Sequence, residues 1–186
     1  MGVYELYEDI YKLKNLLRSG WTKRHAHSKL GRVESDAEHT FSMAILALKI
    51  IQDRNLNLDQ GKVLKLVMYH ELCEIEAGDI APFDGVSQED KYMREYTSVK
   101  KLSEKHNMPE IFDHWIEFEQ AYTPESRFAR EMDKLDAIMQ AKIYARETNN
   151  PKLFEEFKTY SYDIYKKYAE YVDEKIINTD STRNPF

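Results

Sequence analysis

Apolar residues return every three or four positions along almost the whole chain, which predicts helices rather than strands. The first segment shows the pattern: Leu6, Ile10 and Leu13 share one face of a helix that we expect over residues 3–18. A Ser-Gly pair follows, and glycine readily takes the left-handed conformation that ends a helix. No segment of the sequence shows the regular alternation of apolar and polar residues that is typical of a half-buried strand.

Capping residues and prolines mark the ends of the other helices. Ser35 and Glu38 form a capping box before an apolar stretch, and Asp59 and Ser87 are typical N-cap residues. The sequence GDIAPFDGVS at residues 78–87 is rich in turn-forming residues and predicts a loop. These signals predict further helices over residues 36–55, 59–78, 87–107, 109–118, 124–148 and 152–177, the first of them after a polar, basic connection over residues 20–34.

The length and composition of the chain favour one all-α domain. Its 186 residues, 42% of them hydrophobic, suffice for a buried core without disulfide bonds. We therefore predict a single-domain helical bundle over residues 1–178, followed by a C-terminal tail over residues 179–186 that has little apolar surface to bury.

Charge and cysteine content narrow the possible partners and the compartment. The net charge of −6 disfavours binding of a nucleic-acid polymer, because proteins that bind one are usually strongly basic. No apolar stretch approaches the roughly 20 residues that span a bilayer, so we expect no membrane association. The single cysteine, Cys73, and an acidic N-terminus without a secretory signal favour the cytoplasm.

Polar residues interrupt the apolar face of the predicted helix over residues 59–78. His70 follows Leu66 and Val67 at helical spacing, so it continues their inward face, and Glu74 lies one turn further on. A buried carboxylate costs several kcal/mol unless it is neutralised or binds a cation.

Two other predicted helices carry polar residues in similar positions. His39 continues the inward stripe of Met43, and Asp133 and Asp136 lie one turn apart beside Leu135. Two histidines and two carboxylates would form a nitrogen and oxygen site for a divalent transition metal. Taken singly, each residue also fits a hydrogen-bonded core position or a solvated helix edge.

The order of several short segments resembles a known family. The segments are RSGW (18–21), AEHT (37–40), HELCE (70–74), GDIAP (78–82) and MDKLDA (132–137). Over roughly residues 13–145 they resemble the HD-domain metal-dependent phosphohydrolases, and more closely the 5′-deoxynucleotidase branch of that superfamily. The resemblance implies an α-helical fold of the HD-domain type.

The resemblance also implies which residues carry the chemistry. Its metal ligands fall on His39, His70, Glu71 and Asp133, where Glu71 stands at a position that is Asp in the family. The residues that support catalysis fall on Glu74 and Asp79, whose roles the sequence leaves interchangeable. Those that line the nucleotide pocket fall on Arg18, Trp21 and Arg24, in a basic segment of an otherwise acidic chain.

The function that this resemblance implies is release of phosphate from nucleoside 5′-monophosphates, preferably deoxy, by attack of a metal-bound water. The ion would be one divalent cation, with manganese, cobalt, iron or magnesium all compatible with the ligand set. Like many members of the family, the chain is expected to form a homodimer, and we assign its Tyr-rich last helix to the bundle or to such an interface.

Two alternatives stay open at this point. The chain could hydrolyse another nucleotide phosphoester, such as a nucleoside triphosphate or a cyclic nucleotide. It could also be a helical nucleotide-binding module whose metal site is weakened by the longer side chain of Glu71.

Overall fold

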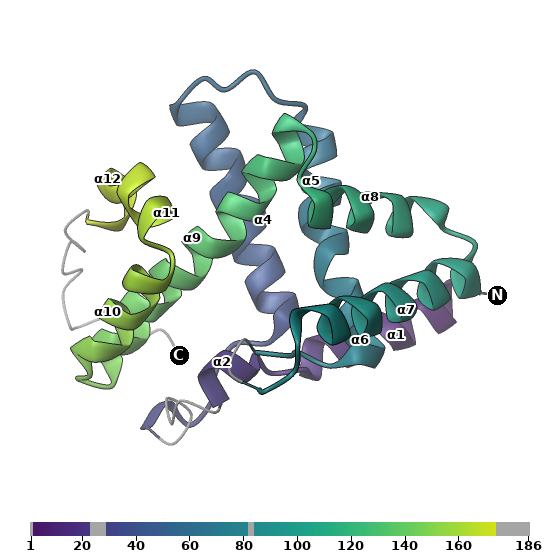
Figure 1. Cartoon of the computed structure of the whole chain (residues 1–186), viewed down its shortest axis with the longest axis horizontal. Helices are drawn as coiled ribbons and strands as arrows, with labels where there is room; N and C mark the ends of the chain where they lie inside the picture. The colour runs from purple at the N-terminus through teal and green to yellow at the C-terminus, as the bar shows by residue number, and fades with distance from the viewer. Residues whose placement is uncertain (1, 23–28, 82–83, 174–186) are drawn as a thin grey trace.

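The computed structural model describes residues 2–22, 29–81 and 84–173, and this part of the chain is helical almost throughout (Figure 1). In these residues, strand-like pairing is limited to one isolated antiparallel bridge between Leu17 and Ser35. The predicted all-α fold is therefore confirmed. None of the described helices is both long enough and apolar enough to cross a bilayer.

Mostly short connections join the helices along the chain. They are α1 (Val3–Asn15), α2 (Ser19–Thr22), α4 (Asp36–Asp53), α5 (Gln60–His70), the 3₁₀ turn η1 (Glu71–Cys73), α6 (Glu74–Ala77), α7 (Gln88–His106), α8 (Pro109–Gln120), α9 (Pro124–Glu147), α10 (Pro151–Tyr160), α11 (Tyr162–Lys167) and α12 (Ala169–Val172). The predicted boundary between domain and tail at residues 178–179 and the predicted substrate residue Arg24 lie outside the described residues.

The predicted caps begin the helices that carry the site. The Ser35 hydroxyl accepts a hydrogen bond from the Glu38 backbone, and the Glu38 carboxylate accepts one from the Ser35 backbone. The side chain of Asp59 accepts a hydrogen bond from the Lys62 backbone at the start of α5, and that of Ser87 accepts one from the Asp90 backbone at the start of α7. These bonds satisfy backbone donors that the first helical turn leaves unpaired.

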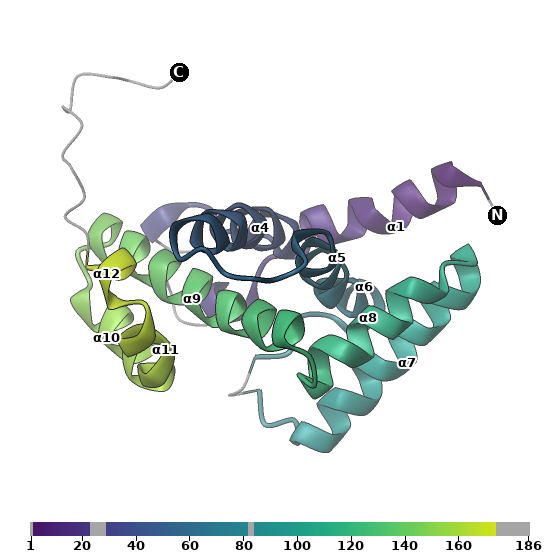
Figure 2. The ribbon, with the colours of Figure 1, turned by 90° about the horizontal axis from the view of Figure 1, so that it is seen from above.

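Three helices enclose the main core. The side chains of α4, α5 and α9 interdigitate through fully buried residues such as Met43, Leu66, Met132 and Leu135. In Figure 2 the long helix α9 passes beside α4 and α5, with α7 and α8 on one side and α10 to α12 on the other. The first turn of α4, the end of α5 and the middle of α9 therefore meet in one place.

The predicted helix over residues 59–78 is not continuous. It changes to a 3₁₀ turn at Glu71 and resumes as an α-helix at Glu74. Hydrogen bonds absent from a straight helix stabilise the turn: the Cys73 thiol donates to the carbonyl of His70, and the hydroxyl of Ser98 on α7 donates to the carbonyl of Cys73. Tertiary contacts with α7 thus override the local helical pattern.

The first and last predicted helices are also shorter than the sequence suggests. α1 ends at Asn15 because the following backbone pairs with residues 34–36, and a separate helical turn, α2, lies within the predicted connection. The last helix breaks at Ser161 and Tyr168, whose φ angles are −120° and −124°. Tyr168 is buried in the main core, so packing of its ring accompanies the break.

Candidate metal centre

His39 enters the core from the first full turn of α4. Its side chain is completely buried. Nδ1 lies 2.7 Å from Asp136 Oδ2, while Nε2 lies 3.3 Å from Asp133 Oδ1 and 3.5 Å from Glu71 Oε1. The capping box at Ser35 sets where α4 begins and so fixes which face of the helix His39 occupies.

His70 is the last residue of α5 and approaches the same place from the other side. Its Nδ1 lies 2.6 Å from the carbonyl oxygen of Val67, and its ring packs against that of Phe118 with 4.6 Å between centroids. Its Nε2 lies 3.2 Å from Glu71 Oε1. The backbone carbonyl accepts the Nδ1 proton, so Nε2 is the nitrogen that faces the site.

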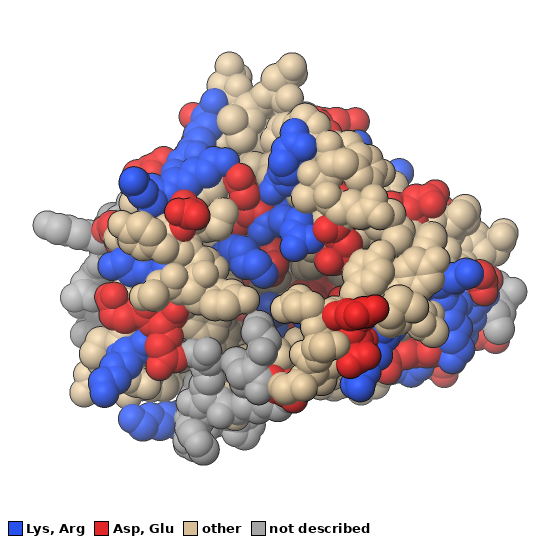
Figure 3. All heavy atoms as spheres, viewed as in Figure 1, with Lys and Arg blue, Asp and Glu red and all other residues tan. Residues whose placement is uncertain are grey.

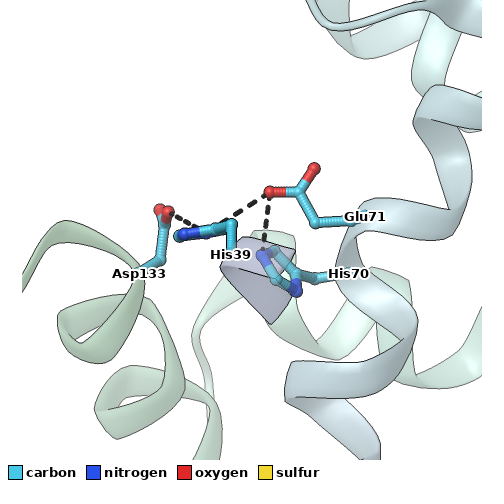
Figure 4. Close-up of side chains that lie close together, drawn as sticks. All are labelled: His39, His70, Glu71 and Asp133. Atoms are coloured by element: carbon cyan, nitrogen blue, oxygen red, sulfur yellow. Dashed lines mark ion pairs between the residues drawn. The ribbon is translucent and has the colours of Figure 1, made fainter. Parts of the chain in front are cut away.

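Four side chains converge where these elements meet, as Figure 4 shows for His39, His70, Glu71 and Asp133. Each offers one ligand atom, and these atoms all lie within 4.8 Å of one another. Neither histidine Nε2 makes a hydrogen bond, although both are buried. Two unpartnered imidazole nitrogens that face two carboxylates fit a divalent cation, which would bind all four groups.

The electrostatics of His39 agree with a cation at this position. Burial and the charge of Arg18 disfavour its protonated form, but the carboxylates of Asp133 and Asp136 outweigh both and raise the pKa of His39 to about 10. The pKa of Asp133 is held well below its usual value despite burial, chiefly by the charges of Lys134 and His39. The site therefore favours positive charge, which a metal ion supplies more strongly than a proton.

Glu71 reaches the cluster in spite of its extra methylene group. Its Oε1 lies near both histidines and also accepts a hydrogen bond of 2.8 Å from Arg18 Nη1. Burial alone would raise the pKa of Glu71, but the charges of His70 and Arg18 hold it well below the usual value. Arg18 thus extends from the segment before α2 to the edge of the cluster.

Glu74 and Asp79 lie next to the four clustered residues. Both line the same pocket as Arg18. Burial, together with the charges of Glu71 and Asp79, raises the pKa of Glu74 well above its usual value. Asp79 is held in place by a short hydrogen bond that its carboxylate accepts from the backbone N–H of Ser19.

The pocket is open to solvent on the face shown in Figure 3, where Lys and Arg side chains gather around a central hollow. Its cationic lining residues are Arg18, Lys91, Arg130 and Lys134. Trp21 also lines the pocket, but it is only 1% exposed and its indole N–H donates to Glu34. It therefore forms part of the pocket wall, with its only hydrogen-bond donor already engaged.

One buried acid near the site was not singled out from the sequence. Asp36 is fully buried, lies 3.5 Å from Arg18, and has a carboxylate oxygen within 4.8 Å of oxygens of Glu71 and Glu74. Burial, followed by the charge of Glu71, raises its pKa to about 7. The available signal was its position three residues before His39, which puts both on one helical face.

A family model described as "HD domain" matches residues 10–173. The chain is 31% identical over 149 residues to a 5′-deoxynucleotidase HDDC2 of Xenopus laevis, a match that covers 78% of this chain and 71% of that protein. It is 29% identical to a 5′-deoxynucleotidase, YGK1, of Saccharomyces cerevisiae, over 80% of this chain and 69% of that protein.

Solved structures share the fold. A conserved hypothetical protein from Pyrococcus furiosus superposes with a TM-score of 0.71 at 24% identity, covering 92% of this chain and 97% of that one. A predicted metal-dependent phosphohydrolase from Magnetospirillum magnetotacticum superposes with a TM-score of 0.67 at 25% identity, covering 92% and 89%. Together with the family match over residues 10–173, these similarities show that the chain belongs to the HD-domain family.

Proposed function

We propose that this protein is a metal-dependent phosphohydrolase that releases phosphate from nucleoside 5′-monophosphates, with a preference for deoxynucleotides. The observation that carries the proposal is the pair of buried, unpartnered Nε2 atoms of His39 and His70 that face the carboxylates of Glu71 and Asp133 beside an open pocket. The relatives named 5′-deoxynucleotidases support the substrate class.

The four clustered residues would hold one divalent ion. Such an ion supplies an acidified water and offsets negative charge on phosphoryl oxygens. The ligand set of two imidazoles and two carboxylates is compatible with manganese, cobalt, iron or magnesium.

Arg18 would bind the phosphate of the substrate. Its guanidinium lies at the pocket wall, 2.8 Å from Glu71 and 3.5 Å from Asp36, so it is close to the ion-binding cluster and oriented by carboxylates. Planar guanidinium groups suit paired hydrogen bonds to phosphate oxygens. We assign Trp21 to the pocket wall, and Arg24 to the same substrate-binding segment on the family resemblance alone.

Glu74 would move a proton in the reaction. Burial and the charges of Glu71 and Asp79 raise its pKa, so its carboxyl group holds a proton more readily than an exposed glutamate does. Asp79, whose carboxylate is fixed by the Ser19 N–H, would orient the attacking water. We thus assign proton transfer to Glu74 and orientation of the water to Asp79, two roles that the sequence alone leaves interchangeable.

The position of Glu71 speaks against a decayed metal site. The longer side chain keeps its Oε1 within 3.2 Å of His70 Nε2 and 3.5 Å of His39 Nε2. The Glu71 carboxylate therefore still reaches the cluster, although the family has the shorter Asp at this position.

From the resemblance and the composition, we further propose that the protein is a cytoplasmic homodimer. Each subunit would have one HD-type domain over residues 1–178. The partner would be a small-molecule nucleotide, with no nucleic-acid polymer or membrane bound. Exposed tyrosines on α1 and α11, among them Tyr4, Tyr7 and Tyr162, are compatible with contacts to a second copy. Sedimentation of the purified protein measures the assembly directly.

A phosphate-release screen tests the activity. Purified protein is incubated with each nucleoside and deoxynucleoside 5′-monophosphate in the presence of manganese, cobalt, iron(II) or magnesium, and both inorganic phosphate and nucleoside are measured. We expect both products in equal amounts and only with added metal. Formation of triphosphate from a nucleoside triphosphate, or of a linear nucleotide from a cyclic one, would instead support the other hydrolase activities.

Single substitutions connect this activity to the site. We expect His70→Ala and Asp133→Ala to lose activity by at least about 100-fold, because each removes one metal ligand. Asp163→Ala is the matched control, since Asp163 is an exposed residue of α11. Retained activity in either ligand variant would contradict the assignment.

A further inference from the structure

The ring of His39 is held between two carboxylates of a single helix. Asp133 and Asp136 are one turn apart on α9, and they face opposite nitrogens of the same imidazole. Asp133 Oδ1 lies 3.3 Å from Nε2, and Asp136 Oδ2 lies 2.7 Å from Nδ1. Residues three apart on a helix share a face, which explains how α9 supplies both contacts.

The contact with Asp136 is isolated from solvent. His39 is completely buried and Asp136 is 6% exposed, so water does not compete for the hydrogen bond. The carboxylate of Glu34 also has an oxygen within 4.8 Å of His39 and Asp136, and its Oε1 accepts the indole N–H of Trp21 at 2.7 Å. Among the described residues, Asp136 is thus the hydrogen-bond partner of His39 Nδ1.

The two histidines are oriented by different means. The Nδ1 of His70 bonds to the carbonyl of Val67 in its own helix, a contact that no substitution of Val67 removes. The Nδ1 of His39 depends instead on a side chain 97 residues later in the chain. A single substitution at Asp136 can therefore change the orientation of His39, whereas the orientation of His70 depends on the backbone of α5.

We infer that Asp136 is a positioning residue of the metal centre: its carboxylate accepts a hydrogen bond from the protonated Nδ1 of His39 and so leaves Nε2 as the nitrogen that binds the ion. A carboxylate on the outer nitrogen of a metal-binding histidine fixes the ring and raises its basicity as a ligand. The inference rests on the proposed function, because it concerns the same ion site. It gives the two aspartates of α9 separate tasks, ligand for Asp133 and orientation for Asp136.

An asparagine at position 136 separates these tasks without changing the size of the side chain. Its amide can turn its NH₂ group toward Nδ1, which moves the ring proton to Nε2 and blocks the ligand nitrogen. We expect Asp136→Asn to weaken the binding of Mn²⁺ by about 10–100-fold, the range found for partners of metal-binding histidines.

The test is a calorimetric titration of the full chain with Mn²⁺. Asp9→Asn serves as the matched control: Asp9 is also a buried carboxylate, but it bonds to Lys12, Lys105 and His106, outside the pocket. We expect the control to bind Mn²⁺ as the wild type does. Wild-type affinity in a folded Asp136→Asn protein would overturn the inference.

A second measurement does not depend on the stability of the variant. In nitrogen-15 spectra of the wild-type protein loaded with Zn²⁺, a diamagnetic probe, the His39 ring should carry a proton on Nδ1 and none on Nε2. His39→Gln identifies the signal by its loss. A proton on Nε2 of His39 in the loaded protein would overturn the inference.

These outcomes are separate from those of the proposed function. A wild type that binds Mn²⁺ but releases no phosphate from any nucleotide would contradict the proposed function and leave the role of Asp136 intact. An active wild type whose Asp136→Asn variant binds Mn²⁺ unchanged would contradict only the role of Asp136.

Discussion

At the scale of single residues, the site is defined by which nitrogen and which oxygen face inward. His39 and His70 each bond through Nδ1 to a neighbour and present Nε2 to the carboxylates of Glu71 and Asp133. The unpaired nitrogens are costly in a buried site unless a cation binds them. The arrangement is therefore suited to a bound cation.

A substitution at Glu74 distinguishes a proton-transfer group from a metal ligand. We expect Glu74→Gln to lower kcat by about 100-fold, a typical loss for a general acid or base, while the Kd for Mn²⁺ changes little. Glu76→Gln is the control, because Glu76 lies on the same short helix but pairs with Lys101 at the surface. A variant with normal kcat would show that Glu74 moves no proton in the reaction.

Residue types and their spacing predicted which side chains gather at this site, but not the hydrogen bonds between them. The inward positions of His39 and His70 follow from helical periodicity. Helical periodicity could not distinguish Asp133 from Asp136, because both lie at the edge of the same apolar face. The family resemblance put the ligand at Asp133, and in the structure Asp133 faces Nε2 of His39 while Asp136 faces Nδ1. The sequence did not mark Asp36 as a site residue, because an acidic residue is also common in the first turn of a capped helix.

At the scale of elements, the site depends on where helices begin and end. α5 stops at His70, and the 3₁₀ turn that follows brings the Glu71 carboxylate to both histidines. Capping boxes and turn residues predicted the starts of α4, α5 and α7. The break after His70 was not predictable, because the turn that follows it is stabilised by a hydrogen bond from the hydroxyl of Ser98 on α7 to the carbonyl of Cys73, 25 residues earlier in the chain.

A partly buried cluster of charged side chains around Asp9 connects α1 to α7. Asp9 on α1 is 3% exposed and bonds to Lys12 on its own helix and to Lys105 and His106 on α7. We expect Asp9→Asn to lower the free energy of unfolding by about 2 kcal/mol at pH 7, because the neutral amide removes the negative charge and one of the two acceptor oxygens that Lys12 and Lys105 bond to. Urea denaturation of the two proteins measures the difference.

The same contact makes a pH-dependent contribution to stability. Burial would raise the pKa of Asp9, but hydrogen bonds from these three side chains outweigh it and hold the pKa far below its value of about 3.9 in an unfolded chain. The stabilisation is therefore complete above pH ~4 and is lost as pH falls further. The difference between wild type and Asp9→Asn should shrink as the pH falls from about 4 to about 2; a constant difference would contradict this account.

At the scale of the whole molecule, the ion-binding cluster joins the helices that form the main core. Its ligands come from α4, from the junction of α5 with η1, and from α9, so an ion would cross-link elements nearly 100 residues apart in sequence. The composition and periodicity predicted the all-α bundle. They did not predict the breaks in the C-terminal helix at Ser161 and Tyr168, of which the second coincides with burial of the Tyr168 ring in the main core.

Metal binding should therefore stabilise the entire fold. At an Mn²⁺ concentration 100 times Kd, the expected gain is about 2.7 kcal/mol, or an increase in Tm of about 5–10 °C for a chain of this size. Differential scanning calorimetry measures it. The increase should disappear in Asp133→Ala and persist in Asp163→Ala; an equal increase in both variants would place the stabilising ion elsewhere.

The central claim is that one ion binds His39, His70, Glu71 and Asp133 together, and anomalous diffraction from a crystal grown with Mn²⁺ tests it most directly. We predict an anomalous peak within about 2.0–2.4 Å of both Nε2 atoms and of one oxygen from each carboxylate. A manganese-containing crystal with no peak among these four side chains would contradict the account.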